Sequence, residues 1–129
     1  MYADESLPEF RKTAYPAGHD FSAIPADKEP GWIIPDELSA NWELRTGKSQ
    51  RRLPELVVEL GKLDMFLHDS EHTHPCMMFE YEIVWEWLSN DGILLSDDIE
   101  KNDVFDVFTN TREPREHGNI TDSTGFVLK

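Results

Sequence analysis

Short apolar runs alternate along this chain with segments in which apolar residues recur every three or four positions. The longer period predicts amphipathic helices, and the short runs flanked by turn residues predict buried strands. Helices are expected over residues 36–42, 50–60, from Pro75 through Leu88 and from Asn102 or Asp103 onward, and strands over 42–45, 63–67, 93–96 and 125–128. Residues 112–119 are expected to form a charged loop. This alternation predicts an α/β fold with a mostly parallel sheet flanked by helices.

Two of the predicted strands end in acidic residues. Asp69 follows the run 63–67, and Asp97 and Asp98 follow the run 93–96. The segment between the runs is long enough for one helix, as in a β-α-β crossover. In such a crossover the carboxyl ends of both strands meet at one edge of the sheet, where ligands bind. We therefore expect these three acids to lie at a common edge.

The first 35 residues differ from the rest because they contain five prolines and no apolar period. A prolyl ring fixes φ and removes a backbone donor, which disfavours a long helix or a central strand. The sequence thus predicts an irregular Pro-rich arm over residues 1–35 and a single partial α/β domain over residues 36–129.

The composition of the chain argues against two classes of binding partner. The chain has 129 residues, of which 26 are acidic and 12 basic, so its formal net charge is −14. Nucleic acids and anionic membranes repel a polyanion, and no apolar run reaches the length of a membrane span, so neither is an expected partner. Cys76 is the only cysteine, which excludes an internal disulfide and is typical of a cytoplasmic protein.

Two motifs carry a family resemblance. They read Asp69-Ser70-Glu71-His72-Thr73-His74 and Gly92-Ile93-Leu94-Leu95-Ser96-Asp97-Asp98. Together they resemble the segments after the fourth and fifth strands of class I S-adenosylmethionine-dependent methyltransferases, in the subgroup with a D-G-D-H-s-y signature. Such enzymes have a Gly-rich cofactor loop after their first strand, but no G-x-G occurs in this chain. The resemblance therefore implies the C-terminal half of a truncated Rossmann-like methyltransferase fold.

The resemblance also implies roles for five residues. In metal-dependent O-methyltransferases of this kind, acids at the positions of Asp69, Asp97 and Asp98 hold Mg²⁺ or another divalent cation. Catalytic roles are implied for His72, as general base, and for Asp69, and cofactor contacts for Ser49 and Asp69. Two alternatives stay open, because acids at strand ends can cap the following helices and a solvated turn explains Ser49 equally well.

His68, His72 and His74 offer a further alternative. Clustered imidazoles interleaved with acids can bind a transition metal, which would make the chain a metal-binding protein or a hydrolase. Exposed loop histidines explain the same residues, His74 above all.

The function implied by the resemblance is S-adenosylmethionine-dependent methyl transfer, metal-dependent O-methylation included, to a small-molecule acceptor. Without a first strand, the run 63–67 forms an unpaired sheet edge. Either the predicted strand 42–45 pairs with this edge, or a second chain covers it. The alternative function is therefore a non-enzymatic acidic interaction protein that forms a homodimer or complements a partner protein through this edge.

Overall fold

The structure, a computed structural model, describes residue 25 and residues 27–129. It divides the chain into two compact units, one of which is Ser49–Lys129, while the described residues before Ser49 belong to the other. Most of the predicted arm, residues 1–24 and 26, lies outside the described residues. The division of the chain at residue 35 stays a prediction.

Among the described residues before Ser49 there is one helix, α2 (Asp36–Ser39). The helix predicted over 36–42 therefore ends earlier, and the strand predicted over 42–45 is wrong. The reason lies in the turn after α2, where the amide of Trp42 donates to the carbonyl of Ser39 (3.2 Å). The indole ring of Trp42 packs against Gly31, where the ring leaves no room for a side chain.

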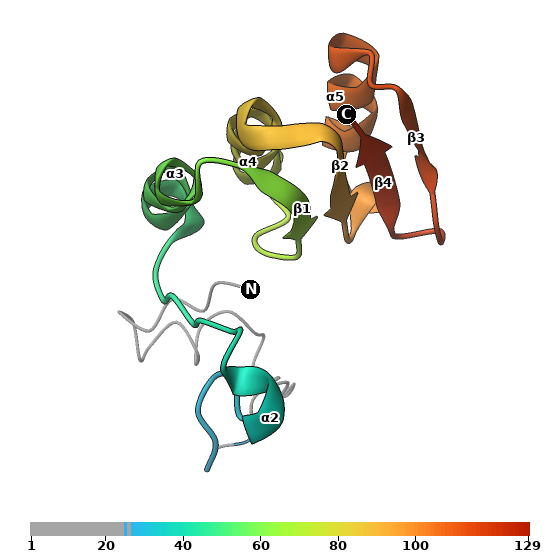
Figure 1. Cartoon of the computed structure of the whole chain (residues 1–129). Helices are drawn as coiled ribbons and strands as arrows, with labels where there is room; N and C mark the ends of the chain where they lie inside the picture. The colour runs from blue at the N-terminus through green and yellow to red at the C-terminus, as the bar shows by residue number, and fades with distance from the viewer. Residues whose placement is uncertain (1–24, 26) are drawn as a thin grey trace, which may run out of the picture. The chain divides into compact units, whose positions relative to one another are not determined.

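The unit Ser49–Lys129, all of which is described, contains a four-stranded sheet with helices (Figure 1). Its elements are α3 (Ser49–Leu60), β1 (Leu63–His68), α4 (His74–Trp87), β2 (Leu88–Ser96), the 3-10 helix η1 (Ile99–Lys101), α5 (Val104–Arg112), β3 (Glu116–Asn119) and β4 (Gly125–Leu128). The strand order is β1-β2-β4-β3. The predicted fold class, a truncated Rossmann-like α/β fold, is confirmed. Within the described ranges, no helix combines the length and apolarity needed to cross a membrane.

The sheet is not mostly parallel, contrary to expectation. β1 and β2 run parallel, whereas β4 pairs antiparallel with both β2 and β3. The segment expected as a charged loop ends in β3, because a short turn lets β3 and β4 form a hairpin. In this turn the amide of Ile120 donates to the carbonyl of Thr124 (2.8 Å). Antiparallel neighbours need only such a turn, while parallel neighbours need a longer crossover.

β1, α4 and β2 form the predicted β-α-β crossover. Their register pairs Met65 with Ile93 and continues without interruption to His68 and Ser96. β2 begins earlier than the predicted run, and its register with β1 shifts before Ile93. The expected turn over residues 90–92 lies in this irregular part, where Asp91 has a φ of 70°.

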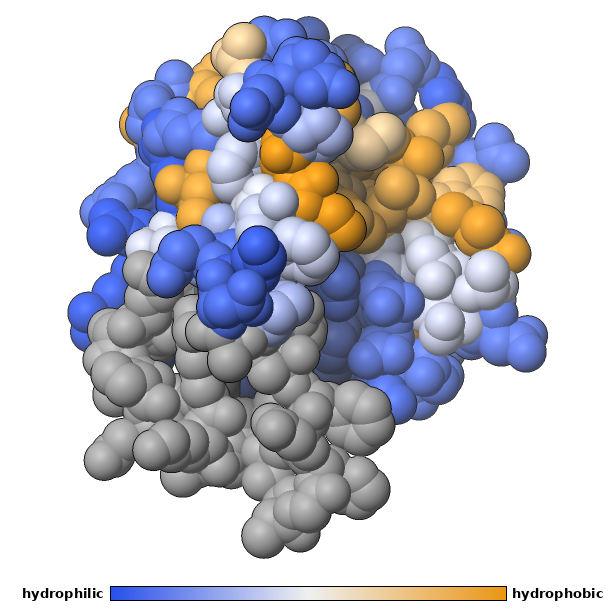
Figure 2. All heavy atoms as spheres, turned by 90° about the horizontal axis from the view of Figure 1, so that it is seen from below, coloured by the Kyte–Doolittle hydropathy of each residue, from blue (hydrophilic) through white to orange (hydrophobic). Residues whose placement is uncertain are grey.

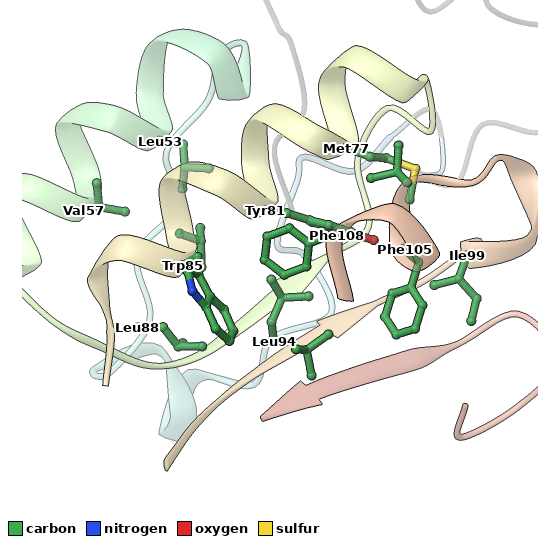
Figure 3. Close-up of a cluster of buried hydrophobic side chains, with 13 residues drawn as sticks. Leu53, Val57, Met77, Tyr81, Trp85, Leu88, Leu94, Ile99, Phe105 and Phe108 are labelled. Atoms are coloured by element: carbon green, nitrogen blue, oxygen red, sulfur yellow. The ribbon is translucent and has the colours of Figure 1, made fainter. Parts of the chain in front are cut away.

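The core lies between α4, α5 and one face of the sheet (Figure 3). The ring of Phe108 packs edge-to-face against Tyr81 (5.3 Å between centroids) and against Trp85 (5.4 Å). Leu94 of β2 and Val127 of β4 are fully buried in the same cluster. Burial of these large aromatic and aliphatic side chains supplies the main favourable term in the folding of so small a unit.

The opposite face of the sheet is apolar and carries no helix of this unit. Because side chains alternate along a strand, the neighbours of the buried Leu94 and Val127 point to this face. Two rows cross all four strands there, namely Met65, Ile93, Leu128 and Glu116, and Leu67, Leu95, Phe126 and Gly118. Met65 and Leu67 are 61% and 55% exposed. Figure 2 shows hydrophobic residues gathered on the strand side of the unit. We call these two rows the open face.

β1 is an edge strand of this sheet, as the sequence predicts. The partner suggested for it, the run 42–45, is not a strand. In the described part of the chain, β1 therefore has no strand on its outer side, and a row of its backbone groups is available for pairing.

Lys129 joins the end of β4 to the carboxyl end of α4, and its removal should destabilise the unit. Its Nζ donates to the carbonyls of Trp85 (2.6 Å) and Leu88 (2.9 Å), where a cation is favourable. Lys129→Met should lower the free energy of unfolding by about 1–3 kcal/mol, because hydrogen bonds from a charged donor are lost. Urea denaturation followed by circular dichroism measures this change. As a control, Lys101→Met removes an exposed lysine beside Glu100 and should cost less than about 1 kcal/mol. Equal losses in both variants would contradict the prediction.

Candidate functional site

The carboxyl edge of β1 and β2 brings the predicted acids to neighbouring backbone positions. His68 pairs with Ser96 across the two strands, and the amide of Asp97 donates to the carbonyl of His68 (2.9 Å). Asp69 and Asp97 therefore follow their strands at the same edge of the sheet. This agrees with the placement expected from the β-α-β pattern.

Beyond the edge, the acidic side chains have different surroundings. Asp69 is exposed. An oxygen of Asp97 accepts a hydrogen bond from Thr124 Oγ1 (3.2 Å). Asp98 has a left-handed backbone (φ 51°), and its Oδ2 lies 3.3 Å from Nδ1 of His72. Asp98 makes no side-chain cap to η1, so the helix-cap alternative is wrong for this residue.

The acids at this edge are not arranged as a metal centre. Among residues 25 and 27–129, no group of three or more His, Cys, Asp and Glu side chains is placed to hold a metal ion. In this structure Asp69, Asp97 and Asp98 thus do not form the near-octahedral oxygen coordination that Mg²⁺ requires. The role of Asp69, Asp97 and Asp98 as metal ligands stays a prediction.

A buried polar network lies behind the edge, between β1 and α4. Nδ1 of His68 is 2.7 Å from Oε2 of Glu80, and Ser70 Oγ donates to Oε1 of Glu80 (2.7 Å). The side chains of His68 and Glu80 are 0% and 2% exposed. Burial alone raises the pKa of Glu80, but hydrogen bonds from His68, Ser49 and Ser70 together bring it below its ordinary value. Glu80 is therefore a buried carboxylate that accepts a hydrogen bond from Nδ1–H of His68.

Ser49, predicted to contact the cofactor, lies at this network. It is 6% exposed, and its Oγ is 3.9 Å from Sγ of Cys76. The alternative of a solvated turn is therefore wrong for Ser49. Burial and the charge of Glu80 raise the pKa of Cys76, so this thiol stays protonated and is a poor nucleophile.

Two histidine rings meet beside the network. The ring of His72 lies edge-to-face with the ring of His68, with 5.3 Å between centroids and an interplanar angle of 88°. In each ring Nδ1 faces a carboxylate, that of Glu80 for His68 and that of Asp98 for His72. The Nε2 atoms of both rings are buried and lack a hydrogen-bond partner within the described residues.

The site of three histidines is not formed. The side chain of His74 is 53% exposed, and its Nε2 lies 3.5 Å from the carboxylate of Asp103. His74 thus agrees with the interpretation as an exposed loop histidine, whereas the buried His68 does not.

Glu80 is the site residue that sequence reasoning missed. It lies on the predicted helix, three residues after Met77 and four before Val84, both of which are fully buried. That spacing places all three on one face of a helix. A carboxylate on a buried face needs a partner, and this requirement is the signal that would have linked Glu80 to a histidine.

Comparison with known proteins found a protein family whose model matches most of this chain. A family model described as a methyltransferase domain matches residues 6–99, which include β1, α4, β2 and the acids after both strands. No curated protein matches the chain, and no solved structure does.

Glu80→Gln should destabilise the protein by about 1–3 kcal/mol at neutral pH, because an amide replaces the carboxylate that holds His68. The pKa of Glu80 is lower in the folded than in the unfolded chain. The stability that Glu80 contributes is therefore present above its ordinary pKa of 4.5 and is lost as the pH falls through the folded pKa. The difference between the unaltered chain and the variant should shrink over that acid range, as urea unfolding at a series of pH values measures.

The matched control is Glu86→Gln on the same helix, because the side chain of Glu86 is 67% exposed. It should cost less than about 1 kcal/mol. A Glu80→Gln effect that is the same at every pH would contradict an ionised Glu80.

Proposed function

The chain belongs to the class I S-adenosylmethionine-dependent methyltransferase family as a partial domain, and we propose that it methylates an oxygen or another nucleophile on a small molecule. The family match supports this proposal, and one geometric observation supports it further. That observation is the pairing of His72 with Asp98 at the carboxyl edge. This edge is where open α/β sheets bind their ligands.

In this proposal His72 is the general base and Asp98 is its positioning residue. Nδ1–H of His72 donates a hydrogen bond to Asp98, and in this tautomer the lone pair of the ring lies on Nε2. Nε2 would then take the proton of the acceptor hydroxyl. When bound, S-adenosylmethionine would supply the electrophilic methyl group, and its sulfur would keep the electrons of the carbon–sulfur bond that breaks. Because Nε2 is buried, the loop between β1 and α4 has to shift before an acceptor reaches it.

Asp69 is the second proposed catalytic residue and also a proposed cofactor contact. It is exposed at the same edge, one residue after β1. An exposed carboxylate there accepts hydrogen bonds from hydroxyl groups of the acceptor or of the cofactor.

The remaining candidate residues rest on the resemblance alone. Ser49 as a cofactor contact has no geometric support, because its hydroxyl faces Cys76 inside the unit. Asp69, Asp97 and Asp98 as ligands of Mg²⁺ or another divalent cation have none either, so no step of the proposal passes through a metal. The sequence also lacks a G-x-G loop. Binding of S-adenosylmethionine therefore depends on other contacts and is the first thing to test.

His72→Gln should lower kcat/KM for methyl transfer by about 10²- to 10⁴-fold, because the general base is lost. Transfer of labelled methyl from S-adenosylmethionine to a panel of hydroxylated small molecules measures this, after isothermal titration has established that the full chain binds S-adenosylmethionine. His74→Gln should keep full activity, since His74 pairs with Asp103 outside the site. A chain that binds no S-adenosylmethionine at millimolar concentration would overturn the enzyme proposal. Equal activity of His72→Gln and the unaltered chain would overturn only the role of His72.

A second candidate function is self-association through the unpaired side of β1. The observation that favours it is the exposure of Met65 and Leu67 on an edge strand. A second copy of the chain is the proposed partner, because β1 is compatible with antiparallel pairing to itself about Met65. In that register Leu63 lies opposite Leu67 and Asp64 opposite Phe66, so no carboxylate faces another. This matters for a chain with a net charge of −14.

Size-exclusion chromatography with light scattering should then show a dimer. Met65→Lys should weaken the dimer at least about tenfold, since a lysine on an edge strand opposes pairing. Val58→Lys, at an apolar site of α3 that is 65% exposed, is the control and should leave the dimer unchanged. A monomer at every concentration tested would rule out the homodimer, whether or not another protein complements the edge.

A further inference from the structure

Within the described residues, two buried imidazole nitrogens lack hydrogen-bond partners, and they belong to adjacent rings. They are Nε2 of His68 and Nε2 of His72, whose ring centroids are 5.3 Å apart. The side chain of His68 is fully buried, and that of His72 is 22% exposed. A buried polar atom that has lost its water without gaining a partner is unfavourable, so this arrangement calls for a ligand.

The carboxylates on the far side of the two rings indicate the chemistry of that ligand. Glu80 lies 2.7 Å from Nδ1 of His68, and Asp98 lies 3.3 Å from Nδ1 of His72. A carboxylate beside Nδ1 accepts a hydrogen bond from Nδ1–H, and this favours the tautomer whose lone pair lies on Nε2. Histidines that bind metals nearly always have this second contact, which fixes the tautomer and raises the basicity of the ligating nitrogen.

We propose that His68 and His72 bind one divalent transition-metal cation of the Zn²⁺ or Co²⁺ type through their Nε2 atoms. Imidazole nitrogen suits these cations, whereas Mg²⁺ prefers oxygen. The described residues contain no group of three ligating side chains, so solvent or an added small ligand completes the coordination. Because both Nε2 atoms are buried, the cation reaches them when the loop between β1 and α4, which carries the partly exposed His72, shifts. This site differs in ligands and in metal class from the acidic site that the family resemblance implies.

The cation would also affect the proposed methyl transfer, although the site does not depend on that proposal. It occupies the His72 lone pair that the general base requires. Zn²⁺ binding and proton abstraction by His72 therefore exclude each other, so Zn²⁺ acts as an inhibitor of an active enzyme.

A competing explanation keeps a proton on one Nε2 and directs it at an aromatic face. His68 lies edge-to-face with Tyr81 as well as with His72, at 5.6 Å and 89°. In that case the ring of Tyr81 or His72 accepts a weak hydrogen bond and no cation binds. The two explanations predict opposite results in a metal titration.

The experiment is a titration of the full chain, purified without an affinity tag, with Co²⁺. Visible absorption reports coordination, and isothermal titration with Zn²⁺ gives the stoichiometry. One cation per chain is expected, with imidazole nitrogen shifts at two Nε2 atoms in the nuclear magnetic resonance spectrum. His68→Gln and His72→Gln should each weaken binding at least tenfold, and a tenfold excess of Mg²⁺ should not compete.

His74→Gln is the matched control, because it removes a neighbouring histidine that also faces a carboxylate but is exposed. Its binding should equal that of the unaltered chain. Circular dichroism checks the fold of each variant, and if His68→Gln does not fold, His72→Gln in the loop decides the question. The proposal is overturned if no cation binds, if His72→Gln binds as well as the unaltered chain, if Mg²⁺ displaces Co²⁺, or if His74→Gln abolishes binding. None of these outcomes requires enzymatic activity, so failure here is distinct from failure of the methyltransferase proposal.

Discussion

Parallel pairing between β1 and β2 determines where each candidate side chain lies. The pairing of Met65 with Ile93 carries through to His68 and Ser96, so both strands end at the same edge. Side chains alternate across a strand, and a slip of one residue would move every one of them to the opposite face. His68 would then point to the open face and the apolar Leu67 would enter the polar network. The register that buries the core is thus the same register that assembles the site.

The contact between His68 and Glu80 reinforces this register. Both side chains are almost fully buried, and Glu80 also accepts hydrogen bonds from neighbouring hydroxyl groups. A buried carboxylate that loses its hydrogen-bond donors is strongly unfavourable, since its charge stays in a medium of low polarity. A shifted β1 would leave Glu80 in that state. The network therefore favours this one alignment of β1 against α4 over shifted alignments.

The sequence was sufficient for those parts of the fold that depend on local periodicity. The 3.6-residue pattern gave α3, α4 and α5, and the apolar runs gave β1, the regular part of β2, and β4. It failed for β3, whose residues Glu116 to Asn119 are polar and form a strand because β4 lies beside them. It also failed for the run at Trp42, where a turn hydrogen bond takes the amide that a strand would need. Tertiary context decided the first case, and a local turn hydrogen bond decided the second.

In the candidate site, too, some features follow from the sequence pattern and others depend on tertiary contacts. The edge that carries Asp69 and Asp97 followed from chain topology, which the order of elements already contains. The partners of each side chain did not follow, because they depend on rotamers and on burial. Asp98 could have been a helix cap or a site residue, and only its 3.3 Å contact with His72 separates the two. Glu80 can lie on the apolar stripe of its helix because His68 and Ser70 bind its carboxylate.

The apolar character of the open face has a physical origin in the fold class. In doubly wound α/β folds, helices cover both faces of the sheet, and the strands are correspondingly apolar on both sides. β2 retains that character, since Ile93 and Leu95 are as apolar as the buried Leu94. In the unit Ser49–Lys129, α4 and α5 cover one face of the sheet, and no helix of the unit covers the other face (Figure 1). The sheet thus has the apolar composition of a two-sided fold, although the helices of its own unit cover one side. Met65 and Leu67 of the open face lie on β1, which also carries His68 and leads into Asp69, so whatever covers this face acts on the strand that positions the candidate site.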